Sequence, residues 1–353
     1  MHAHPLHALF MARAFTALLG TQFLFVVGKE DTNILSGVPV TAPFGRLHSV
    51  IKFLHLRSLF YVLWFAMYSA FRSANIILFT NDLSLAAYAS LVKPFFSFRV
   101  LLEVHGKASG WVTARAVQGA DRVIFVTQEL QNEFKKEAYA MKDSLVLGNA
   151  VDAALFSNAS GTNVRERLTL NGMFVIAYIG RFRPMESDKG VAFLIDALAD
   201  LPPYVALLLV GGTKSEIAYA EDFASEKKVS GRIRAIPYVE ASLIPEYCAA
   251  ADILAYVPPK IDHFLSKETS PMKLFEYMAA GKPIIASDTP SFREAMGDAA
   301  FYITPGSKGE FLKTVLEIAT DPRSKENAAA RGSAQVQGRT WEARSRRALE
   351  NYG

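Results

Sequence analysis

Towards its C-terminus the chain reads Glu268-Thr-Ser-Pro-Met-Lys-Leu-Phe-Glu276, and then Tyr277-Met-Ala-Ala-Gly-Lys-Pro-Ile-Ile-Ala-Ser-Asp288. Two carboxylates eight positions apart flank the start of a predicted helix, which ends at Gly281 before a short apolar strand. A carboxylate can accept hydrogen bonds from two hydroxyl groups, and a helix N-terminus offers N–H groups and positive potential to an anion. The stretch therefore indicates a site for sugar hydroxyls beside a phosphate.

Outward from this stretch, short apolar runs alternate with longer helical patterns, which is typical of a parallel sheet covered by helices. A polar segment from Asn149 to about Arg165 lacks clear periodicity, and we interpret it as an inter-domain linker. We expect two doubly wound, Rossmann-like α/β domains facing across a cleft, with ligands at the carboxyl ends of the strands. Strands are expected at 22–27, 75–79, 99–104, 122–126, 144–147, 174–179, 205–210, 233–236, 253–256, 283–286 and 300–303.

The composition narrows the class of protein. A chain of 353 residues fits about two domains, and 38 basic against 34 acidic residues argue against a dedicated nucleic-acid binder. The single cysteine, Cys248, excludes an intramolecular disulfide and fits a reducing cytoplasm, where we expect it to be an inert packed thiol. No convincing secretory signal is present, because residues 1–5 lack Lys and Arg and because Arg13 interrupts the following apolar run.

Metal ligands are not expected. No Asp-X-Asp motif occurs in the loops that would line the cleft, and no His/Cys cluster has metal-ligand spacing. His2, His4 and His7 are close together in the sequence, and we interpret them as part of a flexible start of the chain.

The most hydrophobic segment runs for fourteen uncharged residues from Ser58 to Phe71. It is too short to span a bilayer as a helix, which needs about 20 residues. Two alternatives stay open: a helix buried against a sheet, or an interfacial helix whose aromatic side chains and flanking Lys52, Arg57 and Arg72 meet anionic headgroups.

Two cations lie where the strand expected at 174–179 ends and the next helix begins. Gly180-Arg181 follows the strand, and Asp188-Lys189-Gly190 opens the helix. Arg offers a bidentate fork and Lys a point charge, so positive charge is concentrated where a diphosphate would lie. Each charge-assisted hydrogen bond there contributes about 1.5–3 kcal/mol, and the same groups suit the negative charge that develops on a leaving diphosphate.

The stretch from Glu268 to Asp288 closely resembles the donor-sugar motif of glycosyltransferase family 4, whose members are retaining enzymes of the GT-B fold. The resemblance implies that Glu268 holds the transferred sugar and that Glu276 holds the ribose. Arg181 and Lys189 are similar to the family's phosphate clamp, with a longer loop of seven residues between them. Catalytic roles are thereby implied for Arg181, Lys189 and Glu268.

The resemblance also extends to the N-terminal half. His105 ends a strand before Gly106 and matches the family's His-Gly, which helps to orient the donor sugar, so the resemblance implies a catalytic role for His105 as well. Glu103, two residues earlier on the same face of the strand, is a weaker candidate. Further donor contacts are implied at Gly180, Tyr238, Val239, Ser270 and Met272. The resemblance implies no cofactor, and it implies a metal-independent transfer with retention in which the leaving diphosphate takes part in deprotonating the acceptor.

The family organisation assigns residues 1–160 to an acceptor-side domain, 161–338 to a nucleotide-sugar-binding domain, and 339–353 to a helix that crosses back from about Trp341. It implies a hexosyltransferase-type enzyme of cell-surface polysaccharide biosynthesis with a glycan or lipid-linked acceptor. The expected location is the cytoplasm or the inner face of the membrane.

The N-terminus departs from the family pattern. A helical pattern at 6–19 precedes the expected strand 22–27, so the family's first strand and Gly-rich loop are missing from the sequence. Two alternatives therefore stay open: a catalytically weak GT-B-like protein that binds nucleotide sugars or regulates, and a nucleotide-sugar epimerase.

Overall fold

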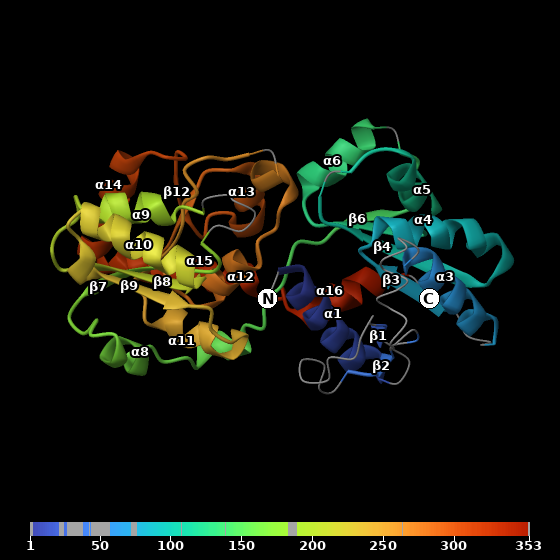
Figure 1. Cartoon of the computed structure of the whole chain (residues 1–353), viewed down its shortest axis with the longest axis horizontal. Coiled ribbons are helices and arrows are strands. Elements are labelled where there is room, and N and C mark those ends of the chain that lie inside the picture. The colour runs from blue at the N-terminus through green and yellow to red at the C-terminus, as the bar shows by residue number, and fades with distance from the viewer. Residues whose placement is uncertain are drawn as a thin grey trace. The chain divides into compact units, whose positions relative to one another are not determined.

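The computed structural model forms two compact units, each a parallel β-sheet covered by helices (Figure 1). This arrangement confirms the expected pair of α/β domains. The first unit contains 1–149, 267–269 and 341–353, and the second contains 150–266 and 270–340. The structure describes residues 3–20, 25–26, 38–41, 43, 57–71, 76–106, 108–137, 139–182, 189–262 and 264–351.

The main sheet of the first unit has the strand order β3-β4-β5-β6, with every pair parallel. Its strands are β3 (Ile76–Thr80), β4 (Phe98–Val104), β5 (Arg122–Phe125) and β6 (Ser144–Val146). The helices of this unit are α1 (Ala3–Leu19), α3 (Arg57–Ala70), α4 (Leu83–Val92), η3 (Lys93–Phe95), α5 (Trp111–Gly119), α6 (Gln128–Lys136) and α16 (Trp341–Leu349). Strands β4 and β5 are buried almost throughout, as expected for parallel strands covered by helices on both faces.

The start of the chain differs from the sequence-based expectation. Of the strand expected at 22–27, the structure describes β1 (Phe25–Val26), which pairs with β2 (Val40–Thr41) in a separate two-stranded sheet. It does not join the main sheet as a second strand. Each of the two strands has two residues, so their ladder is shorter than the strand that the apolar run at 22–27 predicts.

Helix α16 belongs to the first unit although it lies at the far end of the sequence. It packs on α1, and Ala348 joins Leu101, Ile124 and Leu147 in a small apolar cluster on the sheet. Arg122 anchors its end by donating to the carbonyl oxygens of Ala348 (3.0 Å) and Glu350 (2.7 Å). The last helix therefore brings polar side chains to the carboxyl end of β4.

The second unit has the strand order β12-β11-β10-β7-β8-β9, again parallel throughout. Its strands are β7 (Phe174–Ile179), β8 (Val205–Gly212), β9 (Ile233–Pro237), β10 (Ile253–Tyr256), β11 (Ile284–Ser287) and β12 (Phe301–Ile303). Its helices are α7 (Ala154–Ser157), α8 (Thr162–Arg167), α9 (Val191–Leu198), α10 (Lys214–Glu226), η5 (Ser230–Arg232), η6 (Ala241–Leu243), α11 (Ile244–Ala249), α12 (Met272–Ala279), α13 (Pro290–Met296), α14 (Lys308–Thr320) and α15 (Pro322–Val336). The π-helix η7 (Phe264–Glu268) leads towards α12.

The segment 149–165, interpreted from its sequence as an inter-domain linker without clear periodicity, contains the boundary between the units and also two short helices. The segment forms α7 and the start of α8, and it packs on the second unit through buried Phe156 and Val164. Polar residues surround these two apolar anchors in the sequence, and they hide the short helices. The unit boundary accordingly falls between Asn149 and Ala150, against the domain boundary expected after residue 160.

Helix α3 has a buried face, which fits the first alternative left open for 58–71, and an exposed face. It buries Ser58, Val62, Ala66 and Ser69, while the opposite face exposes large apolar side chains. No described helix is long and apolar enough to cross a bilayer. Cys248 is buried in α11, and this burial raises the pKa of its thiol, so the thiol is packed as expected.

Candidate active site at the carboxyl ends of β7 and β10

The second unit reverses its strand order between β7 and β10. Strand β7 leads on one side to β8 and β9, whereas β10 continues on the other side to β11 and β12. In open parallel sheets, ligands bind outside the carboxyl ends of the strands at such a switch point. Tyr178 near the end of β7 and Tyr256 at the end of β10 stand there, with ring centroids 6.2 Å apart. The residues around these two rings form the candidate site.

Lys273, in the first turn of α12, places its amine between the two tyrosines. Its Nζ lies 4.3 Å from the centroid of each ring and donates to the Tyr178 hydroxyl over 2.7 Å. Burial, together with the neighbouring Lys189, lowers the pKa of Lys273 to about 7, and Glu276 opposes this decrease. A cation is thus held at the switch point by aromatic faces, with its charge only partly compensated.

Gly180 gives this amine its space. A Cβ atom at position 180 would lie 2.6 Å from Lys273 Nζ, and the residue has a φ of 144°, which favours glycine. The hydroxyl of Tyr178 donates in turn to the carbonyl oxygen of Arg181 over 2.6 Å. Lys273, Tyr178 and Arg181 are therefore linked, and this chain of hydrogen bonds fixes the backbone from which the Arg181 side chain extends.

The predicted cations Arg181 and Lys189 lie on either side of the loop after β7. The backbone N–H of Lys189 donates to the carbonyl of Phe182 over 3.3 Å, which brings the two ends of this loop together. Residues 183–188 lie outside the described part of the chain. The structure thus brings Lys189 near Lys273, whose pKa it affects, and places Arg181 on the same strand end.

Glu276 follows Lys273 by one helical turn on α12, and its side chain is partly buried. Burial raises its pKa to about 7, although the amine of Lys273 opposes the increase. In the described part of the chain, no side chain donates a hydrogen bond to this carboxylate, so Lys273 is its one charged neighbour of consequence. A carboxylate in this state gains most from hydroxyl donors on a ligand.

Helix α12 itself is held firmly. The Tyr277 hydroxyl accepts from the backbone N–H of Ile179 (2.8 Å) and donates to its carbonyl (3.2 Å). Pro271 is the N-cap residue and no side chain caps the helix, so the N-terminal turn at Ser270 and Met272 is available as an anion-binding geometry. Ser270 itself is buried.

The remaining predicted donor residues lie elsewhere. Tyr238 and Val239 directly follow β9, with Tyr238 half exposed. Glu268 is buried at the end of η7, in the short stretch 267–269 that groups with the first unit. His105 also belongs to the first unit.

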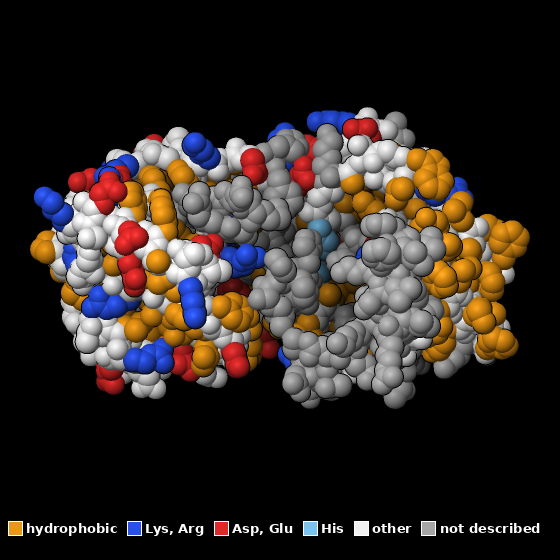
Figure 2. Space-filling model, viewed as in Figure 1, with side chains coloured by type: hydrophobic (Ala, Val, Ile, Leu, Met, Phe, Trp, Pro, Cys, Tyr) orange, Lys and Arg blue, Asp and Glu red, His pale blue; other side chains and the backbone are white. Residues whose placement is uncertain are grey.

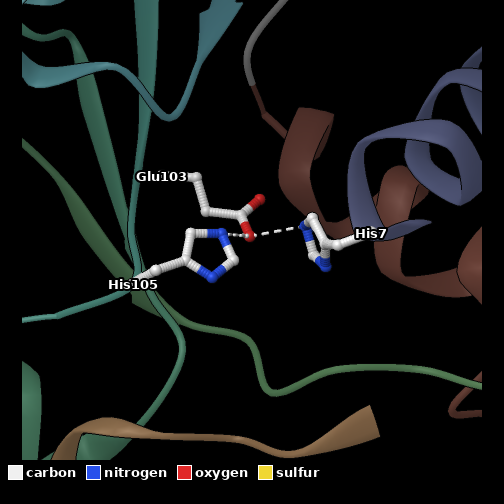
Figure 3. Close-up of side chains that lie close together, drawn as sticks. All are labelled: His7, Glu103 and His105. Carbon is white, nitrogen blue, oxygen red and sulfur yellow. Dashed lines mark ion pairs between the residues drawn. The ribbon is translucent and has the colours of Figure 1, made fainter. Parts of the chain in front are cut away.

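In the first unit, His105 follows β4 and contacts a buried ionic cluster (Figure 3). Its Nε2 lies 2.7 Å from Oε1 of Glu103, and Nε2 of His7 on α1 lies 2.7 Å from the same oxygen. Arg344 of α16 contacts both carboxylate oxygens, at 3.1 and 3.2 Å. Burial would raise the pKa of Glu103, but Arg344 and the two imidazoles outweigh it and hold that pKa well below its usual range.

His7, Glu103 and His105 each offer one atom that can bind a metal ion, and these three atoms lie within 4.8 Å of one another. Two observations fit protons better than a metal ion. A tetrahedral zinc with bonds of about 2.0–2.1 Å keeps its ligand atoms roughly 3.3 Å apart, whereas the imidazole nitrogens lie 2.7 Å from the carboxylate oxygen. The guanidinium of Arg344 also already neutralises the carboxylate.

Sequence reasoning missed three residues of these two sites. Lys273 has a recognisable signal, because it is the one cation between two motif glutamates on an otherwise apolar helix. The interpretation of His7 as part of a flexible start was wrong, because α1 packs on α16 and carries His7 to Glu103. Arg344 carries no local signal, since its partner lies 241 positions away. Glu103, which the sequence predicts as a weaker site candidate on the same strand face as His105, is a member of this buried cluster.

Comparisons with known proteins agree with this geometry. Residues 162–335, which include β7–β12 and α12, match the family model described as "Glycosyl transferases group 1". Residues 162–335 are therefore a group 1 glycosyltransferase domain. The assignment confirms the family that the motif from Glu268 to Asp288 indicates.

Curated relatives are distant and longer. The phosphatidyl-myo-inositol mannosyltransferase of Mycolicibacterium smegmatis is 26% identical over 280 residues, which cover 77% of this chain and 62% of the relative. The O-antigen chain mannosyltransferase B of Escherichia coli is 28% identical over 169 residues, or 47% of this chain and 42% of the relative. The chain thus spans less than two thirds of the length of these relatives.

Solved structures share the fold over nearly the whole chain. Anabaena HepE in complex with UDP and glucose superposes with a TM-score of 0.76 and 20% identity, covering 99% of this chain and 96% of that one. A glycosyltransferase from Rickettsia africae gives a TM-score of 0.78 at 14% identity, covering 98% and 93%. The fold is therefore that of the two-domain GT-B glycosyltransferases.

Proposed function

We propose that the protein transfers a sugar from a nucleotide-diphosphate sugar to a glycan or lipid-linked acceptor, with retention of anomeric configuration and without a metal ion. The observation that carries the proposal is the grouping of Arg181, Lys189, Lys273 and Glu276 around the switch point of the second sheet. Three cations and one carboxylate with unused accepting capacity suit a diphosphate joined to a ribose. The UDP complexes of a similar fold support the same ligand class.

In this proposal the cations neutralise the diphosphate both in the bound donor and as it leaves. Arg181 supplies a bidentate fork, Lys189 a mobile point charge, and Lys273 a fixed one beneath the strand end. Glu276 accepts the ribose hydroxyls, Glu268 accepts a hydroxyl of the transferred sugar, and His105 orients that sugar. The leaving diphosphate deprotonates the acceptor on the same face, which gives retention, and the cations replace the charge stabilisation that a metal would supply.

The first donor experiment measures nucleotide-diphosphate release from a panel of UDP-, GDP- and ADP-sugars. We expect slow release from one donor, and loss of that release in Arg181→Ala and Glu268→Ala. A matched control is Arg165→Ala, whose guanidinium contacts Asp252 and backbone carbonyls on another part of the same unit. A panel with neither release nor thermal stabilisation by any donor would favour a catalytically weak binding or regulatory protein instead.

We further propose that the first unit contacts the membrane surface, as expected for a cell-surface polysaccharide pathway with a lipid-linked acceptor. Phe60, Leu63 and Met67 recur at helical spacing on the exposed face of α3, and the exposed Phe71 directly follows the helix. Leu91 is exposed on α4, which packs on α3, and Phe95 is exposed on η3, which adjoins α4. Figure 2 shows hydrophobic side chains gathered over this part of the unit. Several large apolar side chains grouped on one exposed face favour contact with the interface of a membrane.

Vesicle sedimentation tests this contact. Wild-type protein should sediment with vesicles that contain anionic lipid, and Phe71→Ser combined with Met67→Ser should reduce the bound fraction about tenfold or more. Leu155→Ser is the control, because Leu155 is also an exposed apolar residue but lies on α7 of the second unit. Equal sedimentation of the double variant and the wild type would contradict the proposal while leaving the donor chemistry untouched.

A further inference from the structure

Thr127 lies between β5 and α6, two elements that are fixed by the core of the first unit. Strand β5 is buried along its whole length, and Phe134 of α6 packs on Phe125 with ring centroids 5.1 Å apart. Thr127 is 2% exposed and is the N-cap residue of α6, where its Oγ1 accepts from the backbone N–H of Leu130 over 3.2 Å. The fold therefore sets the position of this hydroxyl.

The same hydroxyl donates to the carbonyl oxygen of Lys267 over 2.5 Å. A hydroxyl has one proton and two acceptor positions, so it can cap α6 and donate to Lys267 at the same time. Lys267 lies in the stretch 267–269, which groups with the first unit, as Thr127 does. The bond therefore holds a segment of the candidate site against a rigid part of that unit.

The sequence gives the Lys267 carbonyl a need for such a donor. Lys267 lies at the end of η7, where the carbonyls of a helix lack partners within the helix. In a continued α-helix this carbonyl would accept from the N–H of residue 271, but that residue is Pro271, which has no N–H. The hydroxyl of Thr127 supplies the donor that the proline cannot.

The anchored carbonyl belongs to the peptide unit that joins Lys267 to Glu268. Because a peptide unit is planar, fixing its oxygen also fixes the plane that ends at the Cα atom of Glu268. The Glu268 side chain is buried, so a shift of its backbone displaces the carboxylate. A displacement of about 1 Å is enough to impair a site that depends on geometry.

We propose that Thr127 is a positioning residue for Glu268: its hydroxyl holds the peptide unit between residues 267 and 268, and with it the direction in which the Glu268 side chain extends. The inference rests on the proposed function, in which Glu268 accepts a hydroxyl of the transferred sugar. It assigns to the N-cap residue of α6 a second task besides capping its own helix.

Hydrogen exchange tests the anchoring without any turnover. Thr127→Val replaces the hydroxyl by a methyl group, whereas Thr127→Ser keeps the hydroxyl. We expect the amides of peptides that cover residues 264–270 to exchange about tenfold faster in Thr127→Val, and at the wild-type rate in Thr127→Ser. An unchanged exchange rate of this segment in folded Thr127→Val would overturn the inference.

A third variant separates the bond to Lys267 from the capping of α6. Thr127→Asp keeps an oxygen that caps the helix, but its carboxylate has no proton to donate. We expect this variant to loosen residues 264–270 as Thr127→Val does, while the first turn of α6 keeps its wild-type exchange. If the segment stays as protected as in the wild type, capping is all that Thr127 contributes and the inference fails.

A double-mutant cycle connects Thr127 to the sugar. Thr127→Val should lower the affinity for the nucleotide sugar about tenfold and leave that for the free nucleotide diphosphate unchanged, because Glu268 serves the transferred sugar. In Glu268→Ala, the additional change Thr127→Val should have no further effect. Additive losses, or an equal loss of affinity for the free nucleotide, would overturn the inference. If no nucleotide sugar binds at all, the exchange experiment still tests the anchoring, and only the proposed function fails.

Discussion

Each unit of the molecule holds a buried or partly buried glutamate, and the two carboxylates are in opposite states. Glu103 in the first unit contacts Arg344, His7 and His105, and these partners hold its pKa well below the usual range. Glu276 in the second unit has Lys273 as a charged neighbour, and burial raises its pKa to about 7. The first carboxylate is satisfied by the protein itself.

The difference separates a structural ion pair from a binding residue. Taking a carboxylate out of water costs several kcal/mol, and only close, well-oriented partners offset that cost. Glu103 has such partners within the first unit, so removing one of them damages the fold. Among the described residues, no side chain donates a hydrogen bond to Glu276, and the close partners of Lys273 are the uncharged Tyr178 and Tyr256, so the second unit carries a cost that a ligand with hydroxyl groups and a diphosphate would relieve. Perturbed groups of this kind mark functional sites more often than structural ones.

The largest expected effect is on the stability of the first unit. Arg344→Met should lower its free energy of unfolding by about 3–5 kcal/mol, because the Glu103 carboxylate is left buried without its main partner. The three tryptophans, Trp64, Trp111 and Trp341, all belong to this unit, so their fluorescence follows its unfolding alone. Arg346→Met on the same helix removes only an exposed pair with Glu342 and should cost less than about 1 kcal/mol. Equal losses of stability for Arg344→Met and Arg346→Met would contradict the claim that Arg344 compensates the buried carboxylate of Glu103.

Glu276→Gln should instead affect ligand binding. We expect the affinity for the bound nucleotide sugar to fall about 10–100-fold, the equivalent of one charge-assisted hydrogen bond to the ribose. Titration calorimetry measures the loss, and Glu221→Gln on the exposed face of α10 is the control. An unchanged affinity would show that Glu276 is a structural residue like Glu103.

The same residue should make stability depend on pH. The pKa of Glu276 is about 7 in the folded protein against an ordinary 4.5, so between these values the folded state binds more protons than the unfolded state. This stabilising contribution is complete below about pH 4.5 and is lost as the pH rises through about 7. Relative to Glu276→Gln, the wild-type second unit should lose up to about 2 kcal/mol between about pH 5 and pH 7. Scanning calorimetry measures the loss, with tryptophan fluorescence identifying the transition of the first unit. A constant difference across this range would contradict the raised pKa.

The smallest expected effect is that of Lys273→Met on stability without ligand. Replacing the amine by an apolar side chain of similar length removes a poorly compensated charge and one hydrogen bond to Tyr178, so the net change should stay within about 1 kcal/mol. Calorimetry of the ligand-free protein checks this. A loss as large as that of Arg344→Met would mean that Lys273 is a structural partner rather than a ligand-binding cation.

The sequence predicts the second unit much better than the first. Its strands, α12 and the residues Arg181, Lys189 and Glu276 follow from local patterns, because a strand end, a loop and a helix start are consecutive in the chain. The cluster of Glu103 is different, because it is formed by α1, β4 and α16. Glu103 lies 96 positions from His7 and 241 positions from Arg344 in the sequence. Neither periodicity nor motif spacing encodes such contacts. The short helices at Phe156 and Val164 escape prediction for another reason, since two apolar residues are too few to show a period.

The most direct test of the comparison is the number of protons exchanged when the nucleotide sugar binds. A diphosphate should raise the pKa of Lys273 and ribose hydroxyls should lower that of Glu276, while the nearby Tyr256, whose pKa is raised by burial, should stay protonated near neutral pH. Calorimetry in buffers of different ionisation enthalpy should therefore find proton release at about pH 6 and proton uptake at about pH 8. Glu276→Gln should abolish the release, and Lys273→Met the uptake. Binding without proton exchange at either pH would contradict the account, because the ligand would then leave the pKa values of Glu276 and Lys273 unchanged. These two groups would be as well compensated before binding as Glu103 is.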